Sequence, residues 1–214
     1  RLTTQRLVAE WQPLLKAQWG AMTRVLLLAL LLTWSVPALS QTRPPALPAD
    51  MLAAPGKPGW TVDADTGCWL RNGNPQPNET VSWSGDCGAD GRATGRGIAE
   101  WRDSGGSARY EGEYRDGEPN GQGVFTDNTK GYRYEGEYRD GKRHGRGVFT
   151  WGSGDRYEGE FLDGKRTGRG VYTRANGDRY EGEYRDGKLH GRGVVTGAKG
   201  DHYEGEFLDG KQTG

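Results

Sequence analysis

The sequence is poor in apolar residues and nearly lacks cysteine and methionine. Hydrophobic residues fill only 33% of its 214 positions, which is low for a compact domain with a thick core. The 29 basic and 29 acidic residues balance, which argues against a general nucleic-acid binder. No Walker-type loop, serine nucleophile elbow or HExxH motif occurs. These shortages favour a non-enzymatic protein, and we predict no catalytic residue and no cofactor.

Glycine, by contrast, is abundant, with 37 residues, and it recurs at a fixed period. Nearly identical segments begin at Tyr134, Tyr157, Tyr180 and Tyr203, each 23 residues after the last. A strict period of this kind is typical of a repeat array. Each unit of such an array packs only on its neighbours, so the array offers a long surface rather than a single pocket.

One unit, residues 134–156, reads YEGEYRDGKRHGRGVFTWGSGDR. Two runs alternate with period 2 around a turn cluster, 140–145, which predicts a β-hairpin. We expect aromatic rings to lie over the bare glycine backbone, so that each hairpin buries its face on the next. If Tyr138 pairs with Gly145, the antiparallel register sets Glu137 opposite Arg146, Gly136 opposite Gly147 and Tyr134 opposite Phe149.

The remaining charged positions of the unit are interpreted as structural. The 23-residue period predicts that one set of glutamates forms a stripe facing arginines of the second strand. His144 and His190 occupy matching turn positions two repeats apart, roughly 20 Å, which is too far to share a metal ion. We therefore predict solvated histidines and no metal site. The glutamate stripe comprises Glu135, Glu158, Glu181 and Glu204.

The segment YEGEYRDGKRHGRGVFT resembles the MORN repeat (membrane occupation and recognition nexus), whose core is YxGxF/YxxGxxxGxG. The resemblance extends from about Trp83 to Gly214 and suggests an exported bacterial-type MORN repeat protein. It implies an all-β fold, an elongated and twisted solenoid of antiparallel β-hairpins with an aromatic-lined groove. It also implies a scaffold that binds peptides or proteins, and lipid binding has been proposed for some members.

The front of the chain differs in composition from the repeats. Residues 22–40 resemble a secretory signal peptide, with a 12-residue apolar stretch from Val25 to Val36 that is short for a membrane span. The alternatives are a buried helix or an anchor that stays attached. Residues 1–21 are interpreted as a non-native upstream segment, with an amphipathic helix as the alternative. We expect an exported protein, periplasmic or extracellular, or membrane-anchored if the signal is uncleaved.

The mature chain is expected to have three parts. Residues 41–59 form a Pro/Ala-rich linker, 60–109 a degenerate capping repeat region, and 110–214 the MORN repeats, the last of them truncated. The only two cysteines, Cys68 and Cys87, predict a disulfide that staples a small N-terminal cap. Closing this loop would contribute about 3 kcal/mol. The alternative, a reactive or metal-binding thiol, lacks a CxxC motif or a nearby histidine.

Three functions follow. The first is a scaffold that binds a protein or peptide along an aromatic groove, and the second is attachment to an anionic lipid or cell-envelope surface through a basic ladder at the hairpin tips. The third is a targeting array for a catalytic domain beyond Gly214. The expected groove rings are Tyr134, Tyr138, Phe149, Tyr157, Phe161, Tyr172, Tyr180 and Tyr184. The expected ladder comprises Lys142, Arg143, Lys165, Arg166, Lys188 and Lys211.

Overall fold

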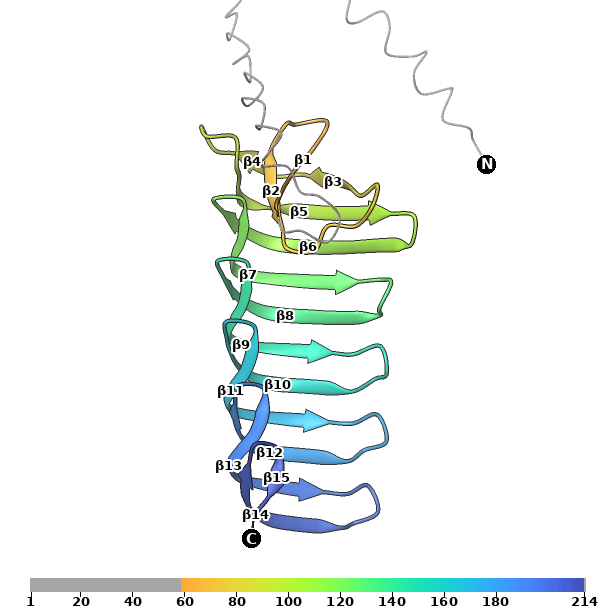
Figure 1. Cartoon of the computed structure of the whole chain (residues 1–214), viewed down its shortest axis with the longest axis vertical. Helices are drawn as coiled ribbons and strands as arrows, with labels where there is room; N and C mark the ends of the chain where they lie inside the picture. The colour runs from red at the N-terminus through yellow and green to blue at the C-terminus, as the bar shows by residue number, and fades with distance from the viewer. Residues whose placement is uncertain (1–58, 214) are drawn as a thin grey trace, which may run out of the picture. The chain divides into compact units, whose positions relative to one another are not determined.

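The computed structural model describes residues 59–213, and within them every regular element is a β-strand (Figure 1). We find no helix in this part that is long and apolar enough to cross a membrane. The signal peptide expected at 22–40 lies outside the described residues, as do residues 1–21 and all but the last residue of the linker. The strands are β1 (Gly59–Val62), β2 (Trp69–Asn72), β3 (Thr80–Trp83), β4 (Asp86–Cys87), β5 (Ala93–Asp103), β6 (Gly106–Arg115), β7 (Glu118–Asp127), β8 (Tyr132–Arg139), β9 (Lys142–Thr150), β10 (Arg156–Leu162), β11 (Lys165–Thr173), β12 (Arg179–Arg185), β13 (Lys188–Thr196), β14 (His202–Leu208) and β15 (Lys211–Gln212).

From β5 onward the strands follow one another in a single antiparallel sheet, in chain order. The described part of this sheet runs from β3, which pairs with β5, to β15, and β4 also pairs with β5. Figure 1 shows the successive hairpins side by side. The prediction of an open array of β-hairpins is confirmed, because each strand pairs with its neighbours in the chain.

Each hairpin closes through a two-residue turn, not through the predicted six-residue cluster. In the β8–β9 hairpin, Arg139 pairs with Lys142, so Asp140 and Gly141 alone form the turn. Their φ values of 48° and 72° are both positive, as a type I′ turn requires. An aspartate tolerates this conformation better than most residues, which explains the recurrent Asp-Gly.

The short turn forces a bulge in the second strand. Gly136 pairs with Gly147 and Tyr134 with Phe149, as predicted. Beyond them, however, Glu137 pairs with His144 and Tyr138 with Arg143, so the predicted pairs of Tyr138 with Gly145 and Glu137 with Arg146 are wrong. The displaced residues, Gly145 and Arg146, pair instead with Phe161 and Glu160 of the next hairpin.

The glutamate beside the bulge binds backbone rather than an arginine side chain. The Arg146 N–H donates to Glu137 Oε1 at 3.4 Å, and the Arg169 N–H donates to Glu160 Oε1 at 3.2 Å. This glutamate therefore satisfies an N–H that the bulge leaves out of the ladder within its own hairpin.

The predicted glutamate stripe lies on the opposite face from the rings, but its partners are not on the second strand. Glu158 pairs with Arg156 of its own strand, with 2.7 Å between Arg156 Nη2 and Glu158 Oε2. Across the sheet its neighbours are Val148 and Val171. The prediction that the stripe faces arginines of the second strand is therefore wrong, although the charge pairing itself is present.

The repeated tyrosine lies over glycine, as the sequence predicts. The Tyr157 hydroxyl donates to the Glu160 carbonyl at 3.1 Å, which lays the ring along its own strand. A Cβ added at Gly159 would lie 2.5 Å from Tyr157 Oη and 2.7 Å from the Arg169 carbonyl oxygen. Both distances are shorter than atoms tolerate, so the ring and a side chain at this position exclude each other.

These tyrosines and the aromatic residue four positions later form a continuous ladder of rings, buried throughout except at Tyr203, which is half-buried. Neighbours in the repeats meet edge to face, with centroids 5.1–5.5 Å apart, a favoured geometry. The ladder connects each hairpin with the next and replaces a thick core. In the described residues it comprises Trp83, Tyr114, Tyr110, Tyr138, Tyr134, Phe161, Tyr157, Tyr184, Tyr180, Phe207 and Tyr203.

The ladder begins with an altered copy of the repeat. The Trp83 indole N–H donates to the Asp86 carbonyl at 3.0 Å, which is the geometry of the repeat tyrosines. The predicted Cys68–Cys87 disulfide is present, with the Cα atoms 5.6 Å apart. We call residues 59–87 the N-terminal cap. The Arg71 N–H donates to the carbonyl of Gly117 at 2.8 Å, so the cap is bonded to the turn of the first full repeat.

Candidate functional site

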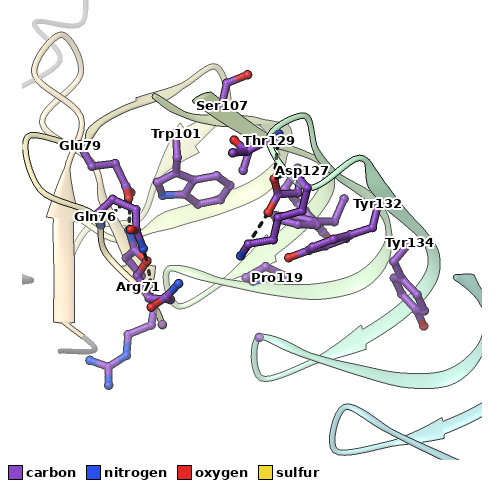
Figure 2. A pocket seen from close by; sticks show the side chains of 18 of the residues that line it. Arg71, Gln76, Glu79, Trp101, Ser107, Pro119, Asp127, Thr129, Tyr132 and Tyr134 are labelled. Carbon is purple, nitrogen blue, oxygen red and sulfur yellow. Dashed lines mark hydrogen bonds and ion pairs between the residues drawn. The ribbon is translucent and has the colours of Figure 1, made fainter. Parts of the chain in front are cut away.

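A groove of about 1170 Å³ lies on the ring-bearing face of the sheet, beside the N-terminal cap. The cap loop from Asn72 to Glu79 forms one end, and residues of β5 to β9 and of the turns between them line the rest, with Gly164 of the next turn beyond. Figure 2 shows Trp101 on one side of the groove and Tyr132 on the other. The groove is therefore enclosed on one side by the N-terminal cap and on the other by the first repeats.

A second row of rings, which we call the outer ring row, runs beside the buried ladder. Its neighbouring centroids lie 4.4–5.9 Å apart, and all its members except Phe149 are half-buried. The first three members line the groove. The row therefore offers ring surface to a partner, whereas the ladder does not. It comprises Phe125, Tyr132, Phe149, Trp151 and Tyr172.

Most rings that we expected in the groove belong to the ladder. They are at most 9% exposed, so they present only edges on this face, and their contact with a partner stays a prediction. Tyr172 belongs to the outer ring row, as does Phe149, which is 7% exposed. The buried ladder members of the expected set are Tyr134, Tyr138, Tyr157, Phe161, Tyr180 and Tyr184.

The sequence reasoning missed three rings of the outer row, namely Phe125, Tyr132 and Trp151. Phe125 shares its repeat position with Phe149, which was a usable signal. Tyr132 begins β8, and Trp151 lies in the connection between β9 and β10. Tyr132 has no aromatic equivalent in the other repeats, and Trp151 has one only in the capping region, Trp101 of β5, so periodicity does not reveal them.

Two arginines of the expected basic ladder lie on the rings instead of at the hairpin tip. The Arg143 guanidinium carbon is 4.9 Å from the Phe149 centroid and 5.6 Å from the Phe161 centroid. Its Nη2 donates to the Gly164 carbonyl at 3.1 Å. The assignment of Arg143 to the tip ladder is wrong, because it follows Lys142 in a strand and successive side chains point to opposite faces.

Arg166 repeats this arrangement one unit later. Its guanidinium carbon lies 5.2 Å from the Tyr184 centroid and 5.5 Å from the Tyr157 centroid. Its Nη2 donates to the Gly187 carbonyl at 2.8 Å. The tip-ladder assignment of Arg166 is therefore also wrong. Each arginine joins the rings of its own hairpin to the turn of the next.

The lysines of the expected ladder are exposed, but carboxylates lie near them. Lys165 Nζ is 3.2 Å from Asp186 Oδ1 of the next hairpin turn. Every turn contributes an aspartate of this kind, as the sequence shows. The exposed members of the ladder are Lys142, Lys165, Lys188 and Lys211.

Burial keeps the phenol groups of the ladder protonated. Removal from water raises the pKa of Tyr157 to about 12, and it raises the pKa of Tyr134 and Tyr138 further still. The Tyr157 hydroxyl is therefore a hydrogen-bond donor throughout the physiological pH range. This state is the one that the bond to the Glu160 carbonyl requires.

An aspartate links the loops between successive hairpins. Asp155 accepts a hydrogen bond from the Ala175 N–H at 2.9 Å and one from the Tyr172 hydroxyl at 2.7 Å. These bonds, the one from Ala175 first, lower the pKa of Asp155. Asp178 accepts the Ala198 N–H in the same way, at 3.0 Å. The loops that border the outer ring row are thus bonded to one another.

The histidines lie in strands rather than in turns. His144 belongs to β9 and His190 to β13, and both are half-buried, so the expectation of solvated turn residues is wrong. Within residues 59–213 no group of three or more histidine, cysteine, aspartate or glutamate side chains could hold a metal ion.

Comparison with known proteins agrees with the repeat geometry. The MORN repeat family matches residues 110–132, 134–156, 157–179, 180–202 and 203–214. Among curated proteins, nothing matches the chain. The first four matched segments each contain one two-residue turn, one bulge and two rings of the ladder. Residues 110–214 are therefore an array of five MORN repeats.

Proposed function

We propose that this array is a scaffold that binds a protein or peptide partner along the groove of its ring-bearing face. MORN repeats are in general a non-catalytic repeat module, and they often mediate protein or membrane-lipid interaction. The observation that carries the proposal is the outer ring row, which leaves half-buried aromatic surface beside a groove of about 1170 Å³.

The rigidity of the rings supports the same proposal. Phe149 packs between Tyr132 and Trp151, with centroid distances of 5.4 and 4.4 Å. Rings that are already held by their neighbours lose little conformational freedom when a partner covers them. Aromatic side chains of this kind supply much of the binding energy at protein interfaces.

The test compares the two faces of the sheet in the full chain. Peptides are selected from a random display library on the wild-type protein, and their affinities are then measured for variants. We expect Tyr132→Ala and Trp151→Ala to weaken binding at least about tenfold, since a buried aromatic anchor contributes about 2 kcal/mol or more. Val148→Ala, on the opposite face, is the control. Affinities that are equal for all three variants would contradict the proposal.

Attachment to an anionic surface is a second candidate, supported by the exposed lysines at successive hairpin tips. Each charge near an anionic membrane contributes about 1 kcal/mol. The two arginines that lie on the rings weaken this candidate. Binding to phosphatidylserine vesicles that disappears with added salt and with Lys142→Gln/Lys188→Gln would favour it over groove binding.

We further propose that the chain is exported. The signal-peptide pattern of residues 22–40 and the Cys68–Cys87 disulfide both support this location, because such bonds persist in oxidising compartments. Exported protein should begin near Gln41 and contain no free thiol. An N-terminus at residue 1 together with two free thiols in the cellular protein would refute it.

A further inference from the structure

The carboxylates that line the groove already have partners. Three of them form ion pairs, of 3.5–3.9 Å, and the other two accept hydrogen bonds within the cap or a turn. A cation therefore lies against three of these five carboxylates, whereas Glu79 and Asp103 only accept hydrogen bonds. The pairs are Glu79 with Asn72, Asp103 with the Gly105 N–H, Glu118 with Arg71, Asp127 with Lys130, and Asp140 with Arg115.

Arg143 has no such carboxylate. Among the described residues its guanidinium forms no ion pair, and it donates a hydrogen bond to the Gly164 carbonyl. It is half-buried against three rings, so water solvates it only partly. A guanidinium has five N–H donors in a fixed fork, of which this bond uses one. Arg166 has the same environment one repeat later. It is half-buried on rings, it donates to the Gly187 carbonyl, and it forms no ion pair with any described residue.

We propose that the ring-bearing face binds an acidic amphipathic segment of a partner protein, whose carboxylates pair with Arg143 and Arg166. This inference rests on the proposed scaffold function and specifies its partner. The apolar side of the segment covers the outer ring row, and the carboxylates bind the remaining guanidinium donors of Arg143, which lines the groove, and of Arg166, which lies beyond it. Paired Arg–carboxylate contacts of this kind combine charge with fixed geometry.

The spacing of the two arginines favours a helix. They lie on β9 and β11, with β10 between them, so their strands are two steps or about 10 Å apart. Carboxylates seven residues apart on a helix lie on one face, with a rise of about 10.5 Å. In an extended segment three residues span about 10 Å, but their side chains then point to opposite faces. We therefore expect Asp or Glu at positions i and i+7 of a helical partner.

The placement of these arginines favours a peptide over a flat membrane. Each guanidinium is held against the sheet by a carbonyl of the next turn, beside half-buried rings. The neighbouring lysines are the exposed cations, so a planar anionic surface meets them first. A narrow segment that lies in the groove at Arg143 and continues along the ring-bearing face reaches Arg166, two strands further on.

The experiment uses the full chain and the display-selected peptides. The double variant Arg143→Gln/Arg166→Gln is compared with Arg146→Gln/Arg169→Gln. The second variant also replaces two arginines of β9 and β11, with the same spacing, but on the opposite, exposed face. We expect selected peptides to carry acidic residues at i and i+7. We expect the first variant to weaken their binding about tenfold for each arginine, and the second to leave it unchanged.

Two further comparisons make the result independent of folding defects. Replacing the two acidic residues of a selected peptide by glutamine should cause the same loss on the wild-type protein. Arg143→Lys/Arg166→Lys should keep the charge but lose the forked geometry, and recover only part of the affinity. Thermal unfolding of each variant shows whether the array itself has changed.

The outcomes separate the inference from the function beneath it. Peptides that need Tyr132 and Trp151 but show no acidic preference, or bind Arg143→Gln/Arg166→Gln normally, overturn the inference and leave the scaffold standing. Peptides insensitive to the ring variants overturn both. Binding to phosphatidylserine vesicles that requires Arg143 and Arg166, with no acidic peptide selected, overturns the inference in favour of a membrane.

Discussion

Substituting Gly159 in β10 tests the lock between glycine and tyrosine. The added Cβ of Gly159→Ala would lie 2.5 Å from Tyr157 Oη and 2.7 Å from both the Arg169 carbonyl oxygen and Gly170 Cα. Two of these three atoms are backbone atoms of β11, so the substitution displaces the ring and also forces a local shift between β10 and β11. Gly159 itself does not have a left-handed φ, so the strain is steric rather than conformational.

The magnitude follows from what the displaced ring loses. The hydroxyl bond to the Glu160 carbonyl is worth about 1 kcal/mol. The edge-to-face contacts with Phe161 and Tyr184 contribute about 0.5–1.5 kcal/mol each. Replacing glycine by alanine returns about 0.5–1 kcal/mol through lower backbone entropy in the unfolded chain. We therefore expect a net destabilisation of about 1–3 kcal/mol.

The assay is the shift of the urea midpoint relative to Glu158→Ala. Glu158 is next in the chain, exposed on the opposite face, and paired only with Arg156, so its loss should cost under about 1 kcal/mol. Glu160 is unsuitable as a control, because its carboxylate accepts the Arg169 N–H in the bulge. Equal midpoints for Gly159→Ala and Glu158→Ala would refute the assignment of faces.

A double-mutant cycle locates the effect at the hydroxyl. Tyr157→Phe alone should cost about 1 kcal/mol, because it removes the bond to the Glu160 carbonyl. In the Gly159→Ala background the same change should cost almost nothing, since the ring has already moved. Additive effects would mean that the alanine does not contact the ring.

Three further predictions concern pH and the cap. The pKa of Asp155 is lowered in the folded state, so its stabilising effect is present above the unfolded pKa of about 3.9 and is lost as the pH falls through the folded value. Asp155→Asn should therefore flatten the acid side of the stability profile, and an unchanged profile would count against this linkage. The pKa of Tyr157 is raised to about 12, so stability should fall as the pH rises above about 10, the unfolded value, and ultraviolet titration should show phenols ionising with unfolding. Cys68→Ser/Cys87→Ser should lower stability by about 3 kcal/mol in urea melts without changing the repeats, and an unchanged midpoint would exclude a stapling role.

The period and the pairing of glycine with glycine were predictable from the sequence, because both depend on strict alternation within a unit. The turn was not, since the segment Asp140–Gly145 contains two glycines and both Gly141 and Gly145 adopt positive φ. Alternation alone does not show which of them closes the hairpin and which forms the bulge. Once Gly141 is assigned to the turn, the pairing of Glu137 with His144 follows.

The alternation of residues in the sequence also did not predict how deeply each aromatic ring is buried. Tyr110 and Phe125 pair across β6 and β7 and both bear rings on one face, yet Tyr110 is buried and Phe125 is only half-buried. The difference arises from glycine, which lets the repeat tyrosine lie flat along the sheet. The place of Arg143 was available in principle, because it alternates in step with Gly147 and Phe149.

Photo-crosslinking of a selected peptide tests the central claim, that the ring-bearing face binds the partner. A peptide with a photoreactive group in its apolar side is bound to the full chain, irradiated, and its adducts are located by mass spectrometry. Binding along the groove and the outer ring row predicts adducts at Phe125 and Tyr132, which line the groove, and at Trp151, which packs on Phe149. Adducts confined to the opposite face, around Val148 and Glu158, would contradict the account.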